Sequence, residues 1–388
     1  MIRARWISVA LVVAATAVGT TGTGGAGTSS TTAPGTTATT AKPGKFPLIA
    51  PGGLRPLLKR ERKAARQAPA TTTPSTTPVT AAPATATPTI AGTATPYFVG
   101  TLHRTFVDPT RGTPARGGAP SSSSRSIATT IYYPTTLAPS EQNPKPRVAT
   151  GPFPLIVFAH GYEIDAAAYA PLLVDLASGG YVVAGPDFPG TSTAYPGGAI
   201  RSDSLQQPGD MSFVITQILA ISVQPGLFYN AVNPNAVGDS GQSDGGVTAA
   251  AAAFNTCCID PRIKASVILT GGSFGFDGQW FPPGTPPVMF VHATGDEVNP
   301  YSASTSMFSQ AQSPKYLMTV EGGSHLEVYV DPPWEPHIAD AMIAFFDLYL
   351  KADPAAAARL DTAANQPGYS LQSGCAPTGP ARATLRSR

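Results

Sequence analysis

The stretch that decides the fold is residues 235–254, which read NAVGDSGQSDGGVTAAAAAF. A short apolar segment leads into glycine-rich sequence, and an alanine-rich segment follows, which predicts a strand, a tight turn and a helix. The turn contains Gly241-Gln242-Ser243-Asp244-Gly245 and fits the pattern G-x-S-x-G. In this strand–turn–helix context the pattern is typical of a nucleophilic serine held at a helix N-terminus, where developing negative charge is favoured. We therefore predict that Ser243 is a nucleophile.

Two other interpretations of this stretch exist. One is a Gly-Ser loop without chemistry. The other takes Gly238-Asp239-Ser240-Gly241 as the motif, which is similar to the nucleophile loop of trypsin-like proteases. That interpretation would need a histidine and an aspartate upstream of the serine in an all-β domain. The segments around the motif disagree with such a domain.

Apolar runs and helical segments alternate on both sides of the motif. The runs expected to be strands are residues 127–134, 154–161, 181–187, 235–240, 263–271, 286–296 and 315–323. The segments expected to be helical are residues 166–178, 208–222, the alanine-rich stretch after Ser243, and 336–350. Strands that are apolar on both faces and alternate with helices indicate a mostly parallel sheet covered on both sides. We expect an α/β fold with its functional residues at the carboxyl ends of the strands.

A serine hydroxyl needs a base, and the chain has five histidines. His325 follows the last predicted strand, where a loop side chain can reach the sheet edge, so we predict that it is the base. A structural histidine in a turn is the alternative. The other histidines fit less well, because they precede the sheet, belong to another motif, lie in a strand or lie in the last helix: His103, His160, His292 and His337.

The base needs an acid that fixes its tautomer. Asp296 follows the predicted strand PPVMFVHATG, and Glu297 is the obvious substitute. A solvated aspartate in a turn is the alternative, because turns favour this residue. The order Ser243, Asp296, His325 is one of the three known orders of such triads, the Ser…Asp/Glu…His order.

The reaction also needs donors for an oxyanion. We expect one to be the backbone N–H of Asp244, directly after the nucleophile. The second is expected from Tyr162, which follows the strand PLIVFAHG. We expect His160 to orient that loop, and the Tyr162 ring to offer a flat surface to substrate, with core packing as its alternative.

Together these residues resemble the α/β-hydrolase superfamily over roughly residues 97–352. Within it the chain is similar to the branch that groups dienelactone-hydrolase-like proteins, platelet-activating-factor acetylhydrolase-like esterases and cutinase-type polyester hydrolases. The motifs that carry the resemblance are IYYPT, FAHGY, LASGGYVVAGPDFPGTS, QPGDMSFVITQIL, GQSDGG and HATGDEVNP. The resemblance implies the α/β-hydrolase fold and a carboxylic ester substrate: a small ester, a lipid or a polyester. It implies no metal and no cofactor.

The chain departs from this branch beside the serine. Polyester hydrolases usually have His and Met there, and this chain has Gln242 and Asp244. They also carry an aromatic residue after the next strand, for which Phe274 and Trp280 are stand-ins, and we predict that both bind substrate. Dienelactone hydrolases use a cysteine nucleophile, which this chain replaces with serine.

Other function classes fit less well. Charged residues make up 12% of the chain and the formal net charge is +2, whereas a nucleic-acid-binding domain usually shows a basic patch. No Cys/His spacing is typical of a zinc site. A peptidase or amidase on the same triad, and a non-catalytic envelope-binding module, remain as alternatives. We expect a monomer.

The N-terminal quarter of the chain predicts export. Residues 1–17 have a basic start, an apolar run and a small-residue cleavage site, as in a secretory signal peptide. The run is shorter than the ~20 residues of a membrane span, and an uncleaved anchor is the alternative. Residues 18–96 are rich in Thr, Ala and Pro and are expected to form a disordered tether. We therefore predict a secreted or envelope-associated protein with a catalytic domain over 97–352 and a tail over 353–388.

The three cysteines are Cys257, Cys258 and Cys375. Export makes a disulfide plausible. Adjacent cysteines rarely bridge each other, because the usual Cα separation suits residues distant in sequence. We therefore expect Cys375 to pair with Cys257 or Cys258.

Overall fold

The computed structural model describes residues 96–374 of the 388-residue chain. The predicted signal peptide, nearly all of the predicted tether and Cys375 lie outside the described residues. Within them no helix has the length and apolarity to cross a membrane.

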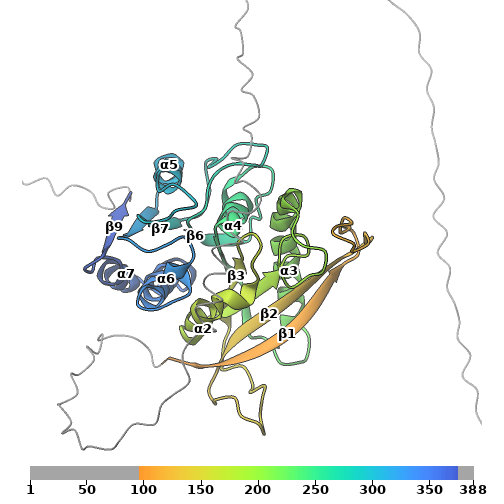
Figure 1. Cartoon of the computed structure of the whole chain (residues 1–388). Helices are drawn as coiled ribbons and strands as arrows, with labels where there is room; N and C mark the ends of the chain where they lie inside the picture. Colours follow the sequence, from red (N-terminus) through yellow and green to blue (C-terminus); the bar gives the residue numbers. More distant parts are fainter. Residues whose placement is uncertain (1–95, 375–388) are drawn as a thin grey trace, which may run out of the picture. The chain divides into compact units, whose positions relative to one another are not determined.

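A nine-stranded sheet forms the centre of the fold (Figure 1). Its order is β1-β2-β4-β3-β5-β6-β7-β8-β9, with parallel pairing from β4 through β8 and antiparallel strands at both edges. The strands are β1 (Phe98–Asp108), β2 (Arg125–Thr135), β3 (Phe153–Ala159), β4 (Val182–Asp187), β5 (Val232–Gln242), β6 (Ile263–Leu269), β7 (Val288–Ala293), β8 (Lys315–Val320) and β9 (Tyr369–Ser373). The predicted α/β fold class is confirmed.

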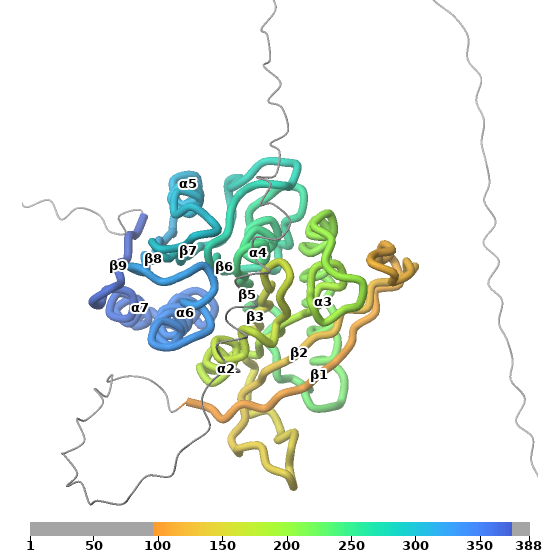
Figure 2. The backbone as a smooth tube through the Cα atoms, in the orientation of Figure 1, coloured from red at the N-terminus to blue at the C-terminus, as the bar shows by residue number. Residues whose placement is uncertain are grey.

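Helices cover both faces of this sheet (Figure 2). One core cluster holds side chains of α3, α4 and α5, and the other holds side chains of α2, α6 and α7. The helices are η1 (Ala166–Tyr169), α2 (Ala170–Ser178), η2 (Arg201–Gln206), α3 (Gln207–Ser222), α4 (Asp244–Phe254), α5 (Ser302–Gln310), η3 (Glu327–Tyr329), α6 (Trp334–Leu350) and α7 (Ala356–Ala364).

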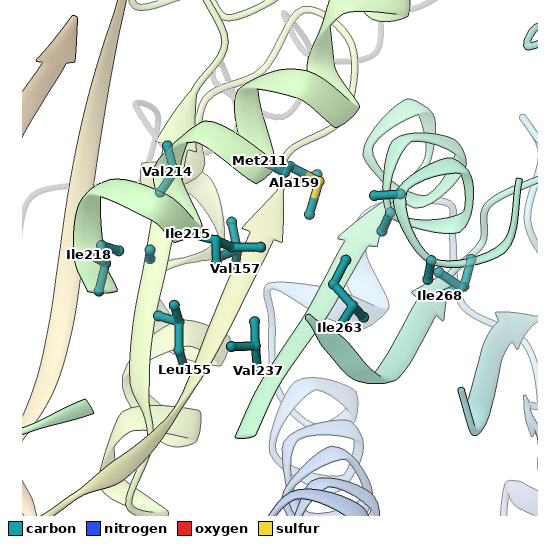
Figure 3. Close-up of a cluster of buried hydrophobic side chains, with 14 of the residues drawn as sticks. Leu155, Val157, Ala159, Met211, Val214, Ile215, Ile218, Val237, Ile263 and Ile268 are labelled. Carbon is teal, nitrogen blue, oxygen red and sulfur yellow. The ribbon is translucent and has the colours of Figure 1, made fainter. Parts of the chain in front are cut away.

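The sequence of β3 shows why the sheet is covered on both sides. All seven residues of FPLIVFA are buried. Because side chains alternate along a strand, Leu155 and Val157 enter one core cluster while Ile156 and Phe158 enter the other. Figure 3 shows Val157 beside Ile215 of α3 in the first of these clusters. A strand that is apolar at every position can be stable only between two layers of helices.

The parallel strands run in the same direction, so their carboxyl ends lie at one edge of the sheet. Ser243 follows β5, Asp296 lies three residues beyond β7, and His325 lies five residues beyond β8. Tyr162 follows β3 at the same edge. The topology therefore gathers the predicted site residues from four separate loops.

The C-terminal boundary of the domain differs from the prediction. Residues 353–388 were expected to form a loose tail, but α7 and β9 lie within them, and β9 pairs antiparallel with β8. Leu360 of α7 is buried in the core cluster that also contains α6. The prediction was wrong here because β9 is a short edge strand, mostly exposed, whose sequence lacks the apolar run of the central strands.

The expected cysteine pairing is also corrected. Cys257 and Cys258 are bonded to each other, in the turn that follows α4. The Asn255 side-chain oxygen accepts the N–H of Cys257, and its backbone carbonyl accepts the N–H of Cys258. The usual Cα separation of bridged cysteines is 4.4–6.8 Å, and this pair has 3.8 Å, so the spacing rule behind the prediction does not cover it.

Candidate active site

Ser243 stands in the turn between β5 and α4 with φ 58° and ψ −123°. A non-glycine residue rarely adopts this conformation, and the structure around it has to hold it there. The flanking glycines make the turn possible. A Cβ on Gly241 would come within 2.2 Å of the Gly245 carbonyl oxygen, and one on Gly245 within 2.0 Å of that of Ala159. Only glycine fits at either position, and the serine is raised at the first turn of α4.

The structure brings the three residues of the predicted triad together. His325 Nε2 lies 2.8 Å from Ser243 Oγ. On the other side of the ring, His325 Nδ1 lies 2.9 Å from Asp296 Oδ1 and 2.8 Å from Oδ2. His325 is buried and the Asp296 side chain is 1% exposed. Since the carboxylate accepts the Nδ1 proton, Nε2 faces the serine as an acceptor.

Asp296 is surrounded by donors. The backbone N–H groups of Val298 and Asn299 each lie 2.8 Å from Oδ1, and the Thr270 hydroxyl donates to Oδ2. Burial raises the pKa of this carboxyl, but hydrogen bonds from His292, His325 and Thr270 outweigh the burial, and its pKa lies well below the usual range. The acid is therefore ionised. The predicted substitute, Glu297, instead accepts the backbone N–H of His325 at 3.1 Å.

A second histidine lies behind the acid. His292 Nε2 is 3.0 Å from Thr270 Oγ1, 3.2 Å from the Asn299 carbonyl and 3.3 Å from Asp296 Oδ2. The hydroxyl proton of Thr270 is already used on Asp296, so these neighbours act as acceptors and Nε2 carries the proton. Neither His292 nor Thr270 is predicted as a site residue from the sequence. An apolar strand and a single threonine at a strand end carry no distinctive signal.

The Gln242 side chain, directly before the serine, joins two loops of the site by hydrogen bonds. Its Oε1 accepts the Tyr169 hydroxyl at 2.8 Å, and its Nε2 donates to the His325 carbonyl at 2.8 Å. The Tyr169 oxygen in turn accepts the N–H of Gly161 at 3.3 Å. Gln242, one of the two residues that depart from the polyester-hydrolase pattern, therefore links the loop of His325 to the loop of Tyr162 through Tyr169.

The loop of Tyr162 is anchored by His160, as its predicted role requires. His160 is fully buried, and its Nε2 accepts the N–H of Phe188 at 3.0 Å. Nδ1 therefore carries the proton and donates to the Gly161 carbonyl at 2.7 Å. Burial lowers the pKa of His160, which favours this neutral form.

The two predicted oxyanion donors lie on elements that meet at the serine. Asp244 is the first residue of α4, where backbone N–H groups have no intrahelical partner. Tyr162 is half-buried, and its ring lies under the guanidinium of Arg201, whose Cζ is 4.1 Å from the ring centroid. The same guanidinium pairs with Asp244, at 2.5 Å between Nη1 and Oδ2. No sequence motif points to Arg201.

The two predicted substrate-binding aromatics have different positions. The Phe274 ring lies against Gly272, and the adjacent Gly271 packs on Gly246 in the first turn of α4. Trp280 forms a β-bridge with Asn255, directly after the last residue of α4. A helix of 11 residues is about 16 Å long, so Trp280 lies at the far end from Ser243. The loop after β6 therefore runs along the helix, and the role of Trp280 in substrate binding stays a prediction.

Among residues 96–374, no group of three or more His, Cys, Asp or Glu side chains is placed to hold a metal ion. The chemistry that the described side chains can supply is a serine nucleophile, a histidine base and a buried carboxylate.

The mostly parallel sheet, the serine turn and the Ser–His–Asp arrangement are similar to those of α/β-hydrolases. The model of the Chlorophyllase family matches residues 137–270. The match covers about a third of the chain, including Tyr162 and Ser243, and ends before Asp296 and His325. It supports the resemblance to α/β-hydrolase serine esterases and, in general terms, carboxylic ester hydrolysis. A search of curated proteins found no match.

Proposed function

We propose that this protein is a carboxylic ester hydrolase that acts through Ser243, His325 and Asp296. The observation that carries the proposal is the continuous line of hydrogen bonds from Ser243 Oγ to His325 Nε2 and from Nδ1 to Asp296. Two further features support it: the constrained backbone of Ser243 and the family match.

In the first half of the reaction, His325 Nε2 takes the proton of Ser243 Oγ as the oxygen attacks the ester carbonyl. The carbonyl oxygen becomes an oxyanion, to which the N–H groups of Asp244 and Tyr162 donate. His325 is then an imidazolium, which the ionised Asp296 stabilises. As the tetrahedral intermediate collapses, the C–O bond to the alcohol breaks, and His325 gives its proton to the leaving alkoxide.

In the second half, water replaces the alcohol. His325 takes a proton from this water, which attacks the acyl carbon of the acyl-enzyme. The intermediate collapses with Ser243 Oγ as the leaving group, and His325 returns the proton to it. The products are one acid and one alcohol for each ester and water consumed, with the enzyme regenerated.

We further propose that the enzyme works outside the cytoplasm. The basis is the composition of residues 1–17 and 18–96, which lie outside the described structure. A basic start, an apolar run and a small-residue cleavage site are typical of a signal peptide, and this pattern supports export.

The test is Ser243→Ala, measured by hydrolysis of p-nitrophenyl esters of increasing acyl length and by labelling with a fluorophosphonate probe. We expect a loss of kcat of about 10⁴-fold or more and no labelling, because the nucleophile is gone. Ser240→Ala is the matched control: this serine belongs to the rival motif and lies buried in β5. It should keep activity and labelling.

Three results would contradict the proposal. Ser243→Ala could hydrolyse esters at the wild-type rate, or Ser240→Ala could be the inactive variant. A wild-type protein that neither hydrolyses the esters nor reacts with the probe would point to a binding module. A peptide panel assayed in parallel separates an amidase from an esterase.

A further inference from the structure

One arginine contacts the side chains of both residues that supply the proposed oxyanion donors. Arg201 opens η2, and its Nη1 lies 2.5 Å from Asp244 Oδ2. The same guanidinium stacks on the Tyr162 ring, with Cζ 4.1 Å from the centroid. Asp244 is the first residue of α4, and Tyr162 lies in the loop after β3. Arg201 therefore bridges the two sides of the proposed oxyanion site.

The carboxylate of Asp244 creates an electrostatic problem at this place. An acidic residue in the first turn stabilises a helix through the helix dipole. In the reaction, however, negative charge develops on an oxygen bound to the backbone N–H of this same residue. A second negative charge nearby raises the energy of that transition state, and the effect is large where water is excluded. A charge that favours α4 thus opposes the reaction unless a cation compensates it.

We propose that Arg201 is a positioning residue of the esterase site, which neutralises Asp244 beside the oxyanion and holds the loop of Tyr162 against the start of α4. This inference rests on the proposed ester hydrolysis. The planar guanidinium suits both contacts at once, because it can pair with a carboxylate in its plane and stack on an aromatic ring with its face. A lysine ammonium could make the ion pair without the stacking.

The fold fixes the element that carries Arg201. Two residues further along η2, buried Asp203 accepts two hydrogen bonds from fully buried Arg125, both of 2.9 Å. Arg125 in turn is fixed by Asp210 of α3, at 2.9 and 2.6 Å. The N–H of Ile200 donates to the Gly190 carbonyl at 2.8 Å. These contacts place the first residue of η2 over the site independently of the Asp244 ion pair.

A double-mutant cycle tests the proposal. The variants are Arg201→Gln, Asp244→Asn and the double variant, assayed with a p-nitrophenyl ester for kcat and KM. Arg262→Gln is the matched control: its side chain is 31% exposed against 35% for Arg201, and it pairs with Asp260 before β6, at the opposite edge of the sheet. The control should keep the wild-type kcat and KM.

We expect Arg201→Gln to lose the most, about 10- to 100-fold in kcat with a small change in KM, because it leaves an uncompensated carboxylate beside the oxyanion. This is less than the ~100- to 1,000-fold loss on removal of a whole oxyanion donor. The double variant should recover part of that loss, since the carboxylate is gone as well. Added salt should also restore activity to Arg201→Gln more than to the wild type.

A purely structural role would give a different pattern, with the double variant no better than Arg201→Gln. That pattern, or a kcat of Arg201→Gln equal to wild type, overturns the inference. In either case the wild type would still hydrolyse esters and react with the fluorophosphonate probe. A wild type without these activities would instead overturn the proposed function.

Discussion

Asp239 and Asp296 are two aspartates of one sheet with opposite surroundings. Asp296 lies beyond the end of β7, where loop N–H groups, a hydroxyl and histidines donate to it, and its pKa is held well below the usual range. Asp239 lies within β5 and is fully buried. Burial raises the pKa of Asp239 well above its ordinary value; the nearby Ser266 hydroxyl offsets this in part, and the charge of Asp260 adds to it.

The opposite pKa shifts of the two aspartates arise because free backbone N–H donors are found beyond the strand ends and not within the sheet. Inside a parallel sheet the N–H groups of neighbouring strands are used in the ladder, so a carboxylate there receives little help. Beyond the strand ends the chain turns, and N–H groups such as those of Val298 and Asn299 point inward. The same side chain therefore has a lowered pKa at the functional edge and a raised pKa in the core.

The largest effect is expected from neutralising the acid at the edge. Asp296→Asn should lower kcat about 10⁴-fold, because an amide no longer selects the His325 tautomer that presents Nε2 as an acceptor to Ser243. The measurement is steady-state ester hydrolysis at neutral pH. Glu297→Gln is the control, since Glu297 contacts the backbone and not the ring of His325. If Glu297→Gln lost more activity than Asp296→Asn, Glu297 would be the acid.

Neutralising Asp239, the aspartate in the core, should stabilise the fold. The folded-state pKa of Asp239 is raised, so its ionisation favours the unfolded chain, and this penalty appears as the pH rises above about 4. Asp239→Asn should therefore increase the free energy of unfolding at pH 7, and by much less near pH 4. Urea denaturation at both pH values measures this difference.

Asp260→Asn provides the comparison of opposite sign. Burial raises the pKa of Asp260, but hydrogen bonds from Arg262 and Ser212 outweigh it, and the pKa lies below its ordinary value. Its ionised form favours the folded chain above about pH 4. Asp260→Asn should thus destabilise the protein at pH 7 and have less effect as the pH falls. A gain in stability from Asp239→Asn that did not depend on pH would argue against a buried neutral acid.

The sequence predicts the three triad residues better than it predicts the side chains that support them. Ser243, Asp296 and His325 could be proposed because chain order and strand ends fix their places. Thr270, His292 and Arg201 could not, because each acts through contacts between segments distant in sequence that no local pattern encodes. The path of a loop has no local sequence signal either, so the sequence did not show that Trp280 lies at the end of α4 far from Ser243.

The cysteines show the same limit for covalent pairing. The bond between Cys257 and Cys258 forms in a turn set by Asn255, which hydrogen-bonds the N–H groups of both cysteines. A rule drawn from residues distant in sequence could not anticipate it. By contrast the α/β fold was predictable, because runs such as FPLIVFA can be buried only between two helical layers.

The smallest effect on kcat is expected from removing one hydrogen-bond donor of Asp296. Thr270→Val deletes the hydroxyl that donates to Oδ2 and keeps the side-chain volume. It makes the surroundings of Asp296 more like those of Asp239, and we expect kcat to fall about 10-fold, in keeping with a lost hydrogen bond to a charged group. Thr270→Ser retains the hydroxyl and should stay close to wild type. Equal activity of the two variants in ester hydrolysis would show that the backbone N–H groups and His325 suffice to hold the carboxylate.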